Sequence, residues 1–420
     1  MAAKRIWILQ QGEQLPCDPG PPRLLRSAIL AAELAKRGHD VRFFNSTFNH
    51  QQKRQRAQHS TEIDAGEGYP AVLLRGMSYR KNISVSRIFS QRQVAKEFTR
   101  LAPTYPEPDV IVCSYPTIDL AAAGVRFGAA NKVPVIVDCR DMWPDIFSDH
   151  LGPFARFLAR PVLGHFERER NAVMAGASAI TGITDAFVDW GVMAAGRRRR
   201  TTDRAFHLAI SPNQPTDDEL AKARKFWQGK LGARKAGSIV LSFAGSINRR
   251  SDFATLFMAL KSLPAKKRRR IVMVICGKGD GLDDVAKLAA GCAEIVFAGW
   301  RNAAEINVLF SQSDVGLLPY PNSKDFLISY PNKVGEYLSH GLTVMSSLEG
   351  LTAGLLAESE AGECYRFGDV ADARRVLEKL LGDVDGRQKQ REACFMAYRK
   401  NFDPKLIYAD FCRYVEQMAR

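Results

Sequence analysis

The sequence lacks long apolar runs. No apolar stretch approaches the roughly 18 residues that a membrane-spanning helix needs. The N-terminal MAAKRIWILQQ holds only four consecutive apolar residues before Gln10, whereas a signal peptide needs an apolar core of about 7 to 15 residues. These absences argue against a membrane-spanning or secreted protein, and we expect it in the cytoplasm.

Paired cysteines and metal motifs are missing as well. Eight cysteines are scattered along the chain, several of them in apolar runs, without a CxxC pair or a Cys/His cluster. This pattern favours buried free thiols over disulfides or a zinc site. An Asp-x-Asp pattern, DVD at residues 383–385, lies between two expected helices and away from strand ends. We therefore interpret it as surface and predict that no metal is required.

Positive charge is abundant and uneven. The 420-residue chain carries a net charge of +15, and residues 1–100 hold 17 Lys and Arg against 8 Asp and Glu. Such an excess favours anionic partners, which include nucleic acid, an acidic membrane surface and phosphorylated substrates. The alternative is a solvated face that aids solubility. With 46% apolar and 25% charged residues, the composition is that of a globular protein whose length favours two domains.

Short apolar runs alternate with helical patterns along the chain, which predicts an α/β fold with doubly wound parallel sheets. A first helix is expected to start near Pro22. The pattern breaks at residues 196–236, so we predict an N-terminal domain (1–205), a C-terminal domain (206–403) and a final helix (404–420) that could pack back on the first domain. Strands are expected at 5–10, 41–44, 71–75, 109–113, 133–139 and 178–183, and then at 238–245, 271–279, 294–299, 314–320, 342–347 and 363–367.

Two expected strands of the second series end in glycine-rich loops with basic residues. Ligands of open parallel sheets bind beyond the carboxyl ends of the strands. Glycine lets the backbone approach a ligand, and loop N–H groups and guanidiniums can bind phosphate. The candidates after the strand at 238–245 are Gly245, Ser246, Arg249 and Arg250, and those after the strand at 271–276 are Gly277 and Lys278. The alternative for either loop is a tight turn.

The stretch SYPNKVGEYLSHG (329–341) reads as a short helix between strands. Pro331 suits a first helical turn and Gly341 suits the position just after a helix. Lys333 then lies in the first turn, and Glu336 lies on the same side three residues later. A carboxylate beside a phosphate site is a natural acceptor for the two hydroxyls of a ribose. The alternative is an ordinary helical ion pair.

These motifs together resemble a known family. The glycine loops, "FAGW", "LLPY" and "PNKVGEYLSHG" resemble the donor-binding half of the retaining GT-B glycosyltransferases of family 4. In the first half, "LAAELAKRGHDVRFFNSTFNH", "PDVIVCSYPTIDLAAAGVRFG" and "VPVIVDCRDMWPDIF" are similar to a branch of bacterial cell-surface sugar transferases that includes N-acetylfucosamine transferases. The resemblance covers nearly the whole chain.

The resemblance implies two Rossmann-like domains that face a central cleft, the first for the acceptor and the second for a nucleotide sugar. It implies that Glu336 holds the ribose, that Arg249, Arg250 and Lys333 lie near the diphosphate, and that the backbone around Trp300 lies near the base. Tyr330 and Asn332 complete the expected donor site. On the acceptor side we expect Gly12, Ser114 and Asp141, each placed just after a strand of the first domain.

Two positions depart from the family pattern. Most relatives carry an acidic residue where this chain has Ile328, which puts sugar recognition in question and makes Asp325 or Tyr330 a possible substitute. Many relatives have His where this chain has Arg140, before Asp141. We expect Arg140 and Asp141, at the end of a strand, to orient the acceptor hydroxyl. The alternative is that they form structural pairs, and Trp143 is expected in the core.

Together with these residues, the resemblance implies a glycosyltransferase that moves a sugar, with retention, from a UDP-linked donor to a lipid-linked or polysaccharide acceptor. Asp141, Arg140, Arg250 and Lys333 are the expected catalytic residues, and cations take the role of a metal. The basic first domain suits attachment to the inner face of the plasma membrane. The alternatives are a non-catalytic nucleotide-sugar binder, a sugar-nucleotide 2-epimerase and a nucleic-acid-binding protein, although no nucleic-acid-binding motif occurs.

Overall fold

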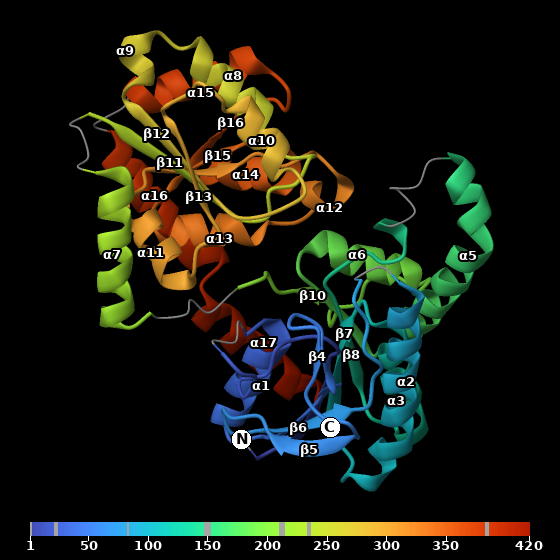
Figure 1. Ribbon diagram of the computed structural model, residues 1–420. Coiled ribbons are helices and arrows are strands. Elements are labelled where there is room, and N and C mark those ends of the chain that lie inside the picture. Colours follow the sequence, from blue (N-terminus) through green and yellow to red (C-terminus); the bar gives the residue numbers. More distant parts are fainter. Residues whose placement is uncertain are drawn as a thin grey trace. The chain divides into compact units, whose positions relative to one another are not determined.

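The strands predicted from the sequence form two separate sheets in the computed structural model (Figure 1). The structure describes residues 2–20, 24–81, 84–146, 153–209, 215–232, 237–382 and 386–420. The chain divides into two compact units. Unit 1 comprises Met1–Ser211 and Pro404–Arg420, and unit 2 comprises Pro212–Asp403.

Unit 1 is built on an eight-stranded sheet in the order β10-β9-β8-β7-β1-β2-β6-β5. All neighbours in it are parallel except β5 and β6. A separate antiparallel hairpin joins β3 and β4. The strands are β1 (Arg5–Leu9), β2 (Asp40–Ser46), β3 (Phe48–Asn49), β4 (Arg54–Gln55), β5 (Thr61–Asp64), β6 (Pro70–Leu74), β7 (Val110–Tyr115), β8 (Val135–Cys139), β9 (Ala179–Gly182) and β10 (Arg204–Ala205).

Helices pack on both faces of this sheet because its strands are apolar on both sides. Ile6 and Ile8 of β1 face a core that also holds residues of the first and last helices of the chain. Trp7 packs on the opposite face against Phe98 and Phe127. The helices are α1 (Arg26–Lys36), α2 (Val85–Leu101), the 3-10 turn η1 (Ala102–Thr104), α3 (Ile118–Asn131), α5 (Pro153–Gly176), α6 (Asp185–Ala194) and α17 (Pro404–Met418). Helix α1 begins at Arg26, and Pro22, near which the sequence suggested its start, lies outside the described residues.

The final helix, α17, completes the core of unit 1. Phe411 stacks on Phe206 with ring centroids 4.4 Å apart, and the Tyr408 hydroxyl donates to the Ala209 carbonyl at 2.9 Å. The chain therefore leaves unit 1, forms unit 2 and returns to unit 1 for its last helix.

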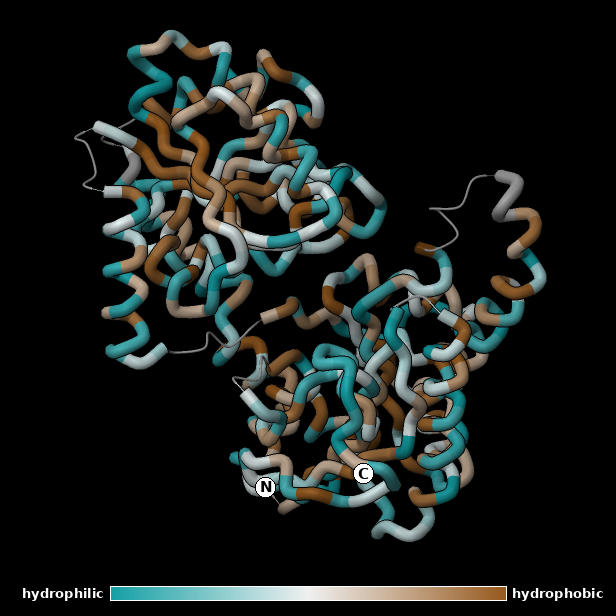
Figure 2. Tube along the Cα trace, viewed as in Figure 1, coloured by the Kyte–Doolittle hydropathy of each residue, from teal (hydrophilic) through white to brown (hydrophobic). Residues whose placement is uncertain are grey.

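Unit 2 is built on a six-stranded, fully parallel sheet in the order β13-β12-β11-β14-β15-β16. Alternate residues of β11 enter cores on opposite faces, with Leu241 and Phe243 on one and Val240 and Ala244 on the other. Figure 2 shows the hydrophobic strands inside each unit under a more hydrophilic exterior. The strands are β11 (Ile239–Ala244), β12 (Ile271–Cys276), β13 (Ile295–Gly299), β14 (Val315–Leu318), β15 (Thr343–Ser346) and β16 (Gly362–Cys364).

Ten helices of the described residues belong to unit 2. They are α7 (Asp217–Leu231), α8 (Phe253–Ser262), α9 (Ala265–Arg268), α10 (Leu282–Leu288), α11 (Ala303–Gln312), α12 (Lys324–Leu327), α13 (Asn332–Ser339), α14 (Gly350–Ser359), α15 (Val370–Gly382) and α16 (Gly386–Asn401). The predicted fold class, two doubly wound Rossmann-like domains, is confirmed. Within the described ranges, no helix combines the length and apolar character needed to cross a bilayer.

Candidate functional site

The loops after β11 and β12 lie backbone to backbone. Ile247 N–H donates to the Lys278 carbonyl at 2.9 Å, and Gly281 N–H donates to the Ile247 carbonyl at 3.1 Å. A Cβ atom at Gly277, whose φ is +146°, would lie 1.8 Å from the Gly245 carbonyl oxygen. A Cβ atom at Gly279 would lie 1.9 Å from the Ile247 carbonyl oxygen. The two loops can therefore meet only because these positions are glycines. The sequence had suggested instead that the glycines allow a ligand to approach or form a tight turn.

Helix α13 brings Lys333 and Glu336 to this loop pair. The Cε atom of Lys333 lies 3.7 Å from the position of a Cβ at Gly245. Its Nζ atom lies 2.5 Å from Glu336 Oε2, and the two side chains are 17% and 25% exposed. The first two turns of α13 therefore place an ammonium and a carboxylate at the carboxyl end of β11. This contact is also the helical ion pair that the sequence left open.

Buried aromatic residues fix the orientation of α13. Tyr337 is fully buried, and its hydroxyl donates to the Leu317 carbonyl at 3.1 Å. Its ring occupies the space beside Gly316, where a Cβ atom would lie 2.3 Å from Tyr337 Cγ. Burial raises the pKa of the nearby Tyr320 to about 12, and the negative charge of Glu336 adds to this shift. Because one face of α13 is anchored in the core, its charged face is held at the sheet edge.

Most of the other expected donor residues lie on the surface of unit 2. Trp300 is 60% exposed and follows Gly299, whose carbonyl accepts from Gly277 N–H at 2.9 Å. Arg249 is paired with Asp284 at 3.3 Å, with both side chains largely exposed. Ser246, Arg250, Lys278 and Asn332 are exposed.

The segment before α13 contains the position where the family pattern is broken. Tyr330 is half-buried with its ring 5.4 Å from that of Phe402. Asp325 lies in α12 and Ile328 caps that helix, and both are half-buried. Asp325 and Tyr330 remain candidates for sugar contact.

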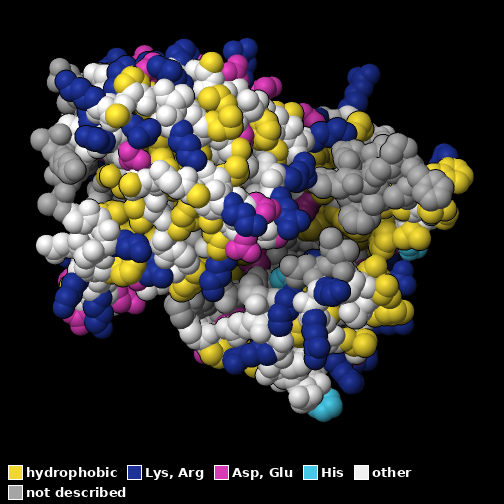
Figure 3. All heavy atoms as spheres, turned by 45° about the horizontal axis from the view of Figure 1, so that its top comes forward, with side chains coloured by type: hydrophobic (Ala, Val, Ile, Leu, Met, Phe, Trp, Pro, Cys, Tyr) yellow, Lys and Arg dark blue, Asp and Glu magenta, His cyan; other side chains and the backbone are white. Residues whose placement is uncertain are grey.

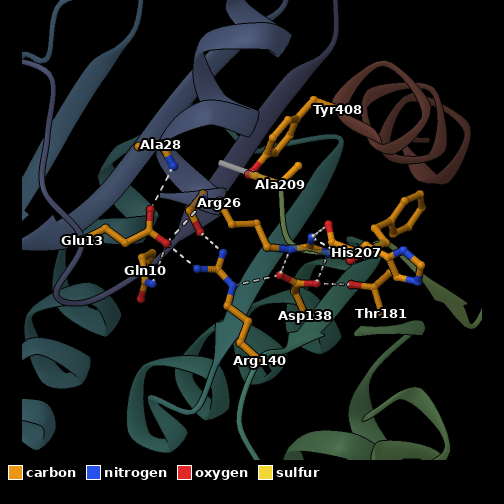
Figure 4. A network of polar contacts seen from close by, with 12 residues as sticks. Gln10, Glu13, Arg26, Ala28, Asp138, Arg140, Thr181, His207, Ala209 and Tyr408 are labelled. Carbon is orange, nitrogen blue, oxygen red and sulfur yellow. Dashed lines mark hydrogen bonds and ion pairs between the residues drawn. The ribbon is translucent and has the colours of Figure 1, made fainter. Parts of the chain in front are cut away.

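In unit 1, Arg140 lies inside a network of charges (Figure 4). Its guanidinium is paired with Glu13, donates to Asp138 at 3.1 Å and contacts the Ser27 hydroxyl. Glu13 in turn accepts from Ala28 N–H at 3.0 Å, at the start of α1. All three guanidinium nitrogens are thus engaged by the chain itself. This geometry favours the structural-pair alternative for Arg140 over direct contact with an acceptor.

Asp138 is the centre of this network. Arg26 binds it through two nitrogens at 2.8 and 3.0 Å, and the Thr181 hydroxyl donates to it at 2.8 Å. Burial alone would raise the pKa of Asp138, but the positive charges of Arg26 and Arg140 outweigh it and hold that pKa well below its usual range. Arg26 also donates to the Phe206 carbonyl at 2.8 Å. The network thereby ties β8 to α1 and to the last residues of unit 1 before unit 2.

The expected acceptor-side residues have different environments. The strand β7 continues to Tyr115 instead of ending at Cys113. Ser114 is therefore a residue of the strand and not of the loop after it, and it is only 4% exposed. Gly12 follows β1 with a φ of +105°, and its N–H donates to Asn45 Oδ1 at 3.2 Å. Asp141 is half-buried just beyond β8. Trp143, expected in the core, is half-buried in the loop after β8, with its ring edge-on to Phe166 at 5.8 Å.

Sequence reasoning missed the other charged residues of the network around Arg140. Glu13, Arg26 and Asp138 are almost fully buried charged residues. Asp138 carried a signal, because a strand buried on both faces normally reads as an uninterrupted apolar run. Glu13 and Arg26 lie in the first loop and helix start, where a charged residue is ordinary.

Metal ligands do not gather in the part of the chain that the structure describes: no group of three or more His, Cys, Asp or Glu side chains could hold an ion there. The DVD sequence at residues 383–385 lies outside the described residues.

Comparisons with known proteins agree with this architecture. Residues 26–202 match the family model of the glycosyl transferase 4-like domain, and residues 238–383 match that of glycosyl transferases group 1. No curated protein gives a significant match. The chain therefore joins two glycosyltransferase domains and is a GT-B glycosyltransferase of the family 4-like type.

Solved structures share the fold over nearly their full length. Anabaena Alr3699/HepE in complex with UDP is 13% identical, with a TM-score of 0.63 over 99% of this chain and 100% of that chain. An α,α-trehalose-phosphate synthase (UDP-forming) from Burkholderia vietnamiensis is 13% identical, with a TM-score of 0.71 over 99% and 98%. WaaG, a glycosyltransferase involved in lipopolysaccharide biosynthesis, is 16% identical, with a TM-score of 0.61 over 98% and 99%. At these identities the likeness establishes the fold.

Proposed function

We propose that this chain transfers a sugar from a UDP-linked donor, bound by unit 2, to an acceptor hydroxyl bound by unit 1, with retention of configuration. The observation that carries the proposal is the Lys333–Glu336 pair, 2.5 Å apart on the first turns of α13 and beside Gly245 at the end of β11. The similar HepE structure contains UDP, which supports UDP as the nucleotide. Both a hexose and an N-acetylhexosamine are compatible with these residues.

Each charge at this edge has a role in donor binding. The Glu336 carboxylate accepts hydrogen bonds from the two ribose hydroxyls, since it is an acceptor only. The Lys333 ammonium moves from Glu336 to the diphosphate, where the N-terminus of α13 adds its positive dipole. Arg250, Lys278 and Arg249 lie on the loops after β11 and β12 and neutralise the remaining phosphate charge, and Trp300 flanks the base.

In the proposed reaction, the bond between the anomeric carbon and the diphosphate oxygen breaks while a bond to the acceptor oxygen forms. The acceptor proton leaves with the diphosphate, so the products are the glycosylated acceptor and the nucleoside diphosphate. Lys333 and Arg250 stabilise the negative charge that develops on the leaving group. One preorganised donor of this kind typically contributes about 3 to 4 kcal/mol to transition-state stabilisation.

On the acceptor side, Asp141 orients the acceptor hydroxyl. Arg140 acts as a positioning residue, because its contacts with Glu13, Asp138 and Ser27 fix the backbone from which Asp141 projects. A lipid-linked or glycan acceptor and attachment to an anionic membrane are supported by the charge of residues 1–100. The similar WaaG structure is a glycosyltransferase of lipopolysaccharide biosynthesis.

Ligand-induced thermal stabilisation tests donor binding. A panel of nucleoside-diphosphate sugars is added to wild type, to Glu336→Gln and to a matched control, Glu358→Gln, whose side chain is exposed on α14. We expect one UDP-sugar to raise Tm of the wild type and the control. Glu336→Gln should bind it about 10 to 100 times more weakly, because hydrogen bonds to a charged group contribute roughly 1.5 to 3 kcal/mol. An equal response of Glu336→Gln would refute the ribose assignment.

A further inference from the structure

Four side chains of unit 1 form a cluster between the β3–β4 hairpin and the start of α2. The Nδ1 atom of His50 lies 2.8 Å from the Tyr79 hydroxyl oxygen. The Nζ atom of Lys53 lies 3.4 Å from His50 Nδ1 and 5.0 Å from the centre of the Tyr79 ring. Arg87, near the N-terminus of α2, is close enough to act electrostatically on His50, Lys53 and Tyr79. We name His50, Lys53, Tyr79 and Arg87 the hairpin cluster.

The hairpin cluster is positively charged, and its basic groups lower the pKa values of their neighbours. Burial lowers the pKa of His50 to about 4, and the positive charges of Lys53 and Arg87 contribute to the shift. Burial and Arg87 likewise lower the pKa of Lys53. Two cations held close together attract an anion more strongly than either one alone. The hydroxyl of Tyr79 and the imidazole of His50 add hydrogen-bonding groups suited to phosphate oxygens.

Apolar side chains are exposed next to this cluster. Val85 and Phe89 are 68% and 55% exposed and lie four residues apart, on one side of the first turns of α2. Met77, in the loop that leads to Tyr79, is 51% exposed. Exposed cations are close in sequence, since Arg54 follows Lys53 and Arg80 and Lys81 follow Tyr79. Figure 3 shows Lys and Arg side chains over both units, with hydrophobic ones among those of unit 1.

Cations beside exposed apolar residues match the chemistry of a lipid phosphate. The phosphate is anionic and sits at the membrane surface, and the hydrocarbon chain lies just beneath it. A free sugar phosphate would use the cations but leave Val85 and Phe89 exposed to water. A nucleic acid would favour aromatic residues interleaved with the cations over an aliphatic and phenyl pair on one helix side.

We propose that the hairpin cluster binds the phosphate of a lipid-linked acceptor while Val85 and Phe89 enter the surface of the bilayer. This inference rests on the proposed function, since it identifies the acceptor as a lipid phosphate ester and places its binding site in unit 1. The side chains that bind the phosphate are Lys53, Arg87, Tyr79 and His50. The sugar-accepting end of the lipid then extends from the phosphate along the ends of the parallel strands of unit 1.

Vesicle sedimentation tests this assignment with the full chain. Phosphatidylcholine vesicles contain either hexadecyl phosphate or the same amount of palmitate, which carries the same chain length with a carboxylate in place of the phosphate. The test variant is Lys53→Gln/Arg87→Gln. The control variant, Lys96→Gln/Arg100→Gln, removes the same charge from exposed positions at the other end of α2. A second test variant, Val85→Ser/Phe89→Ser, removes the apolar pair.

We expect wild type and the control variant to prefer hexadecyl phosphate vesicles over palmitate vesicles. Lys53→Gln/Arg87→Gln should lose about tenfold or more of the binding to hexadecyl phosphate vesicles, since each cation near a membrane surface contributes on the order of a several-fold change in affinity. Val85→Ser/Phe89→Ser should also lose about tenfold or more, because apolar area buried in the bilayer contributes to the affinity. Equal losses in test and control variants would overturn the inference, because charge alone would then explain binding. Absence of vesicle binding by the wild type would also overturn it.

Donor-induced stabilisation, measured on the same variants, separates this inference from the proposed function. The hairpin cluster lies in unit 1 and the donor residues in unit 2, so each variant should still be stabilised by the UDP-sugar. If the donor stabilises every variant and vesicles discriminate none of them, only the lipid phosphate site is wrong. If no donor stabilises any of them, the proposed function is wrong as well.

Discussion

A few buried charged side chains hold the interior of unit 1 together. Asp138 and Arg26 are each 1% exposed and form a two-point ion pair, to which Arg140 adds a second cation. A buried charge is tolerated only when its partners satisfy it, because the cost of removing it from water is several kcal/mol. The three residues therefore depend on one another, and the loop that carries Asp141 depends on them.

Replacing Asp138 should be costly. Asp138→Asn leaves two guanidiniums without their counter-charge, and removal of one partner of a buried pair typically costs about 3 to 5 kcal/mol of unfolding free energy. Asp189→Asn is the control, because Asp189 is 62% exposed and pairs with Arg199 on the surface. Its loss should cost about 1 kcal/mol or less. Urea unfolding that shows equal costs for the two variants would contradict the central role of Asp138.

The ion pair of Asp138 with Arg26 also makes the stability of the fold depend on pH in a known direction. The pKa of Asp138 in the folded chain lies below that of an unfolded Asp, so its contribution to stability is complete above the unfolded value of about 4. That contribution is lost as the pH falls further towards the folded value. The stability difference between wild type and Asp138→Asn should therefore be constant from neutral pH down to about pH 4 and shrink below it.

At the scale of elements, the close contact of the loops after β11 and β12 shapes the edge of unit 2 where α13 begins. Gly277, Gly279 and Gly281 each lack room for a Cβ atom because the backbone of the other loop lies against them. This contact sets the position of Gly245, next to which Lys333 lies. The glycines thus act on the candidate donor site through loop geometry.

Gly277→Ala and Gly354→Ala should have opposite effects on stability. The first places a Cβ atom 1.8 Å from the Gly245 carbonyl oxygen at a φ of +146°, which should cost at least about 2 kcal/mol through strain and overpacking. At Gly354, in α14, a Cβ atom would meet nothing within 4 Å, and alanine there should add about 0.5 to 1 kcal/mol. Thermal melts would contradict the role given to the loop contact if Gly277→Ala were neutral.

The elements that could be predicted from the sequence are those with a strong local pattern. Strands buried on both faces, such as β6 and β12, read as apolar runs, and the spacing of Lys333 and Glu336 on a helix fixes a common side. The two-residue strands β3, β4 and β10 and the four-residue edge strand β5 are too short for such a pattern. The Arg140–Glu13 pair joins residues 127 positions apart, which no local pattern can indicate.

At the scale of the whole molecule, the two units have their own sheets and cores, and each contains a different candidate site. Unit 2 contains the Lys333–Glu336 pair and the glycine loops, and unit 1 contains the Asp138 network and the basic hairpin cluster. The last helix, α17, belongs to unit 1 although the chain reaches it only after unit 2. The proposed donor site thus lies in the inserted unit, and the excess of basic residues in 1–100 belongs to the other.

Catalysis is the central claim, since a nucleotide-sugar binder could share every residue of the donor site. The decisive measurement is hydrolysis of the stabilising UDP-sugar to UDP and free sugar, with water as the acceptor, by purified wild type, Lys333→Met and Lys389→Met. The side chain of Lys389 is 78% exposed. We predict UDP release by wild type and Lys389→Met and a loss of about 100-fold or more in Lys333→Met, as for removal of one preorganised charge stabiliser. Donor binding without UDP release by the wild type would contradict a transferase and indicate a sensor.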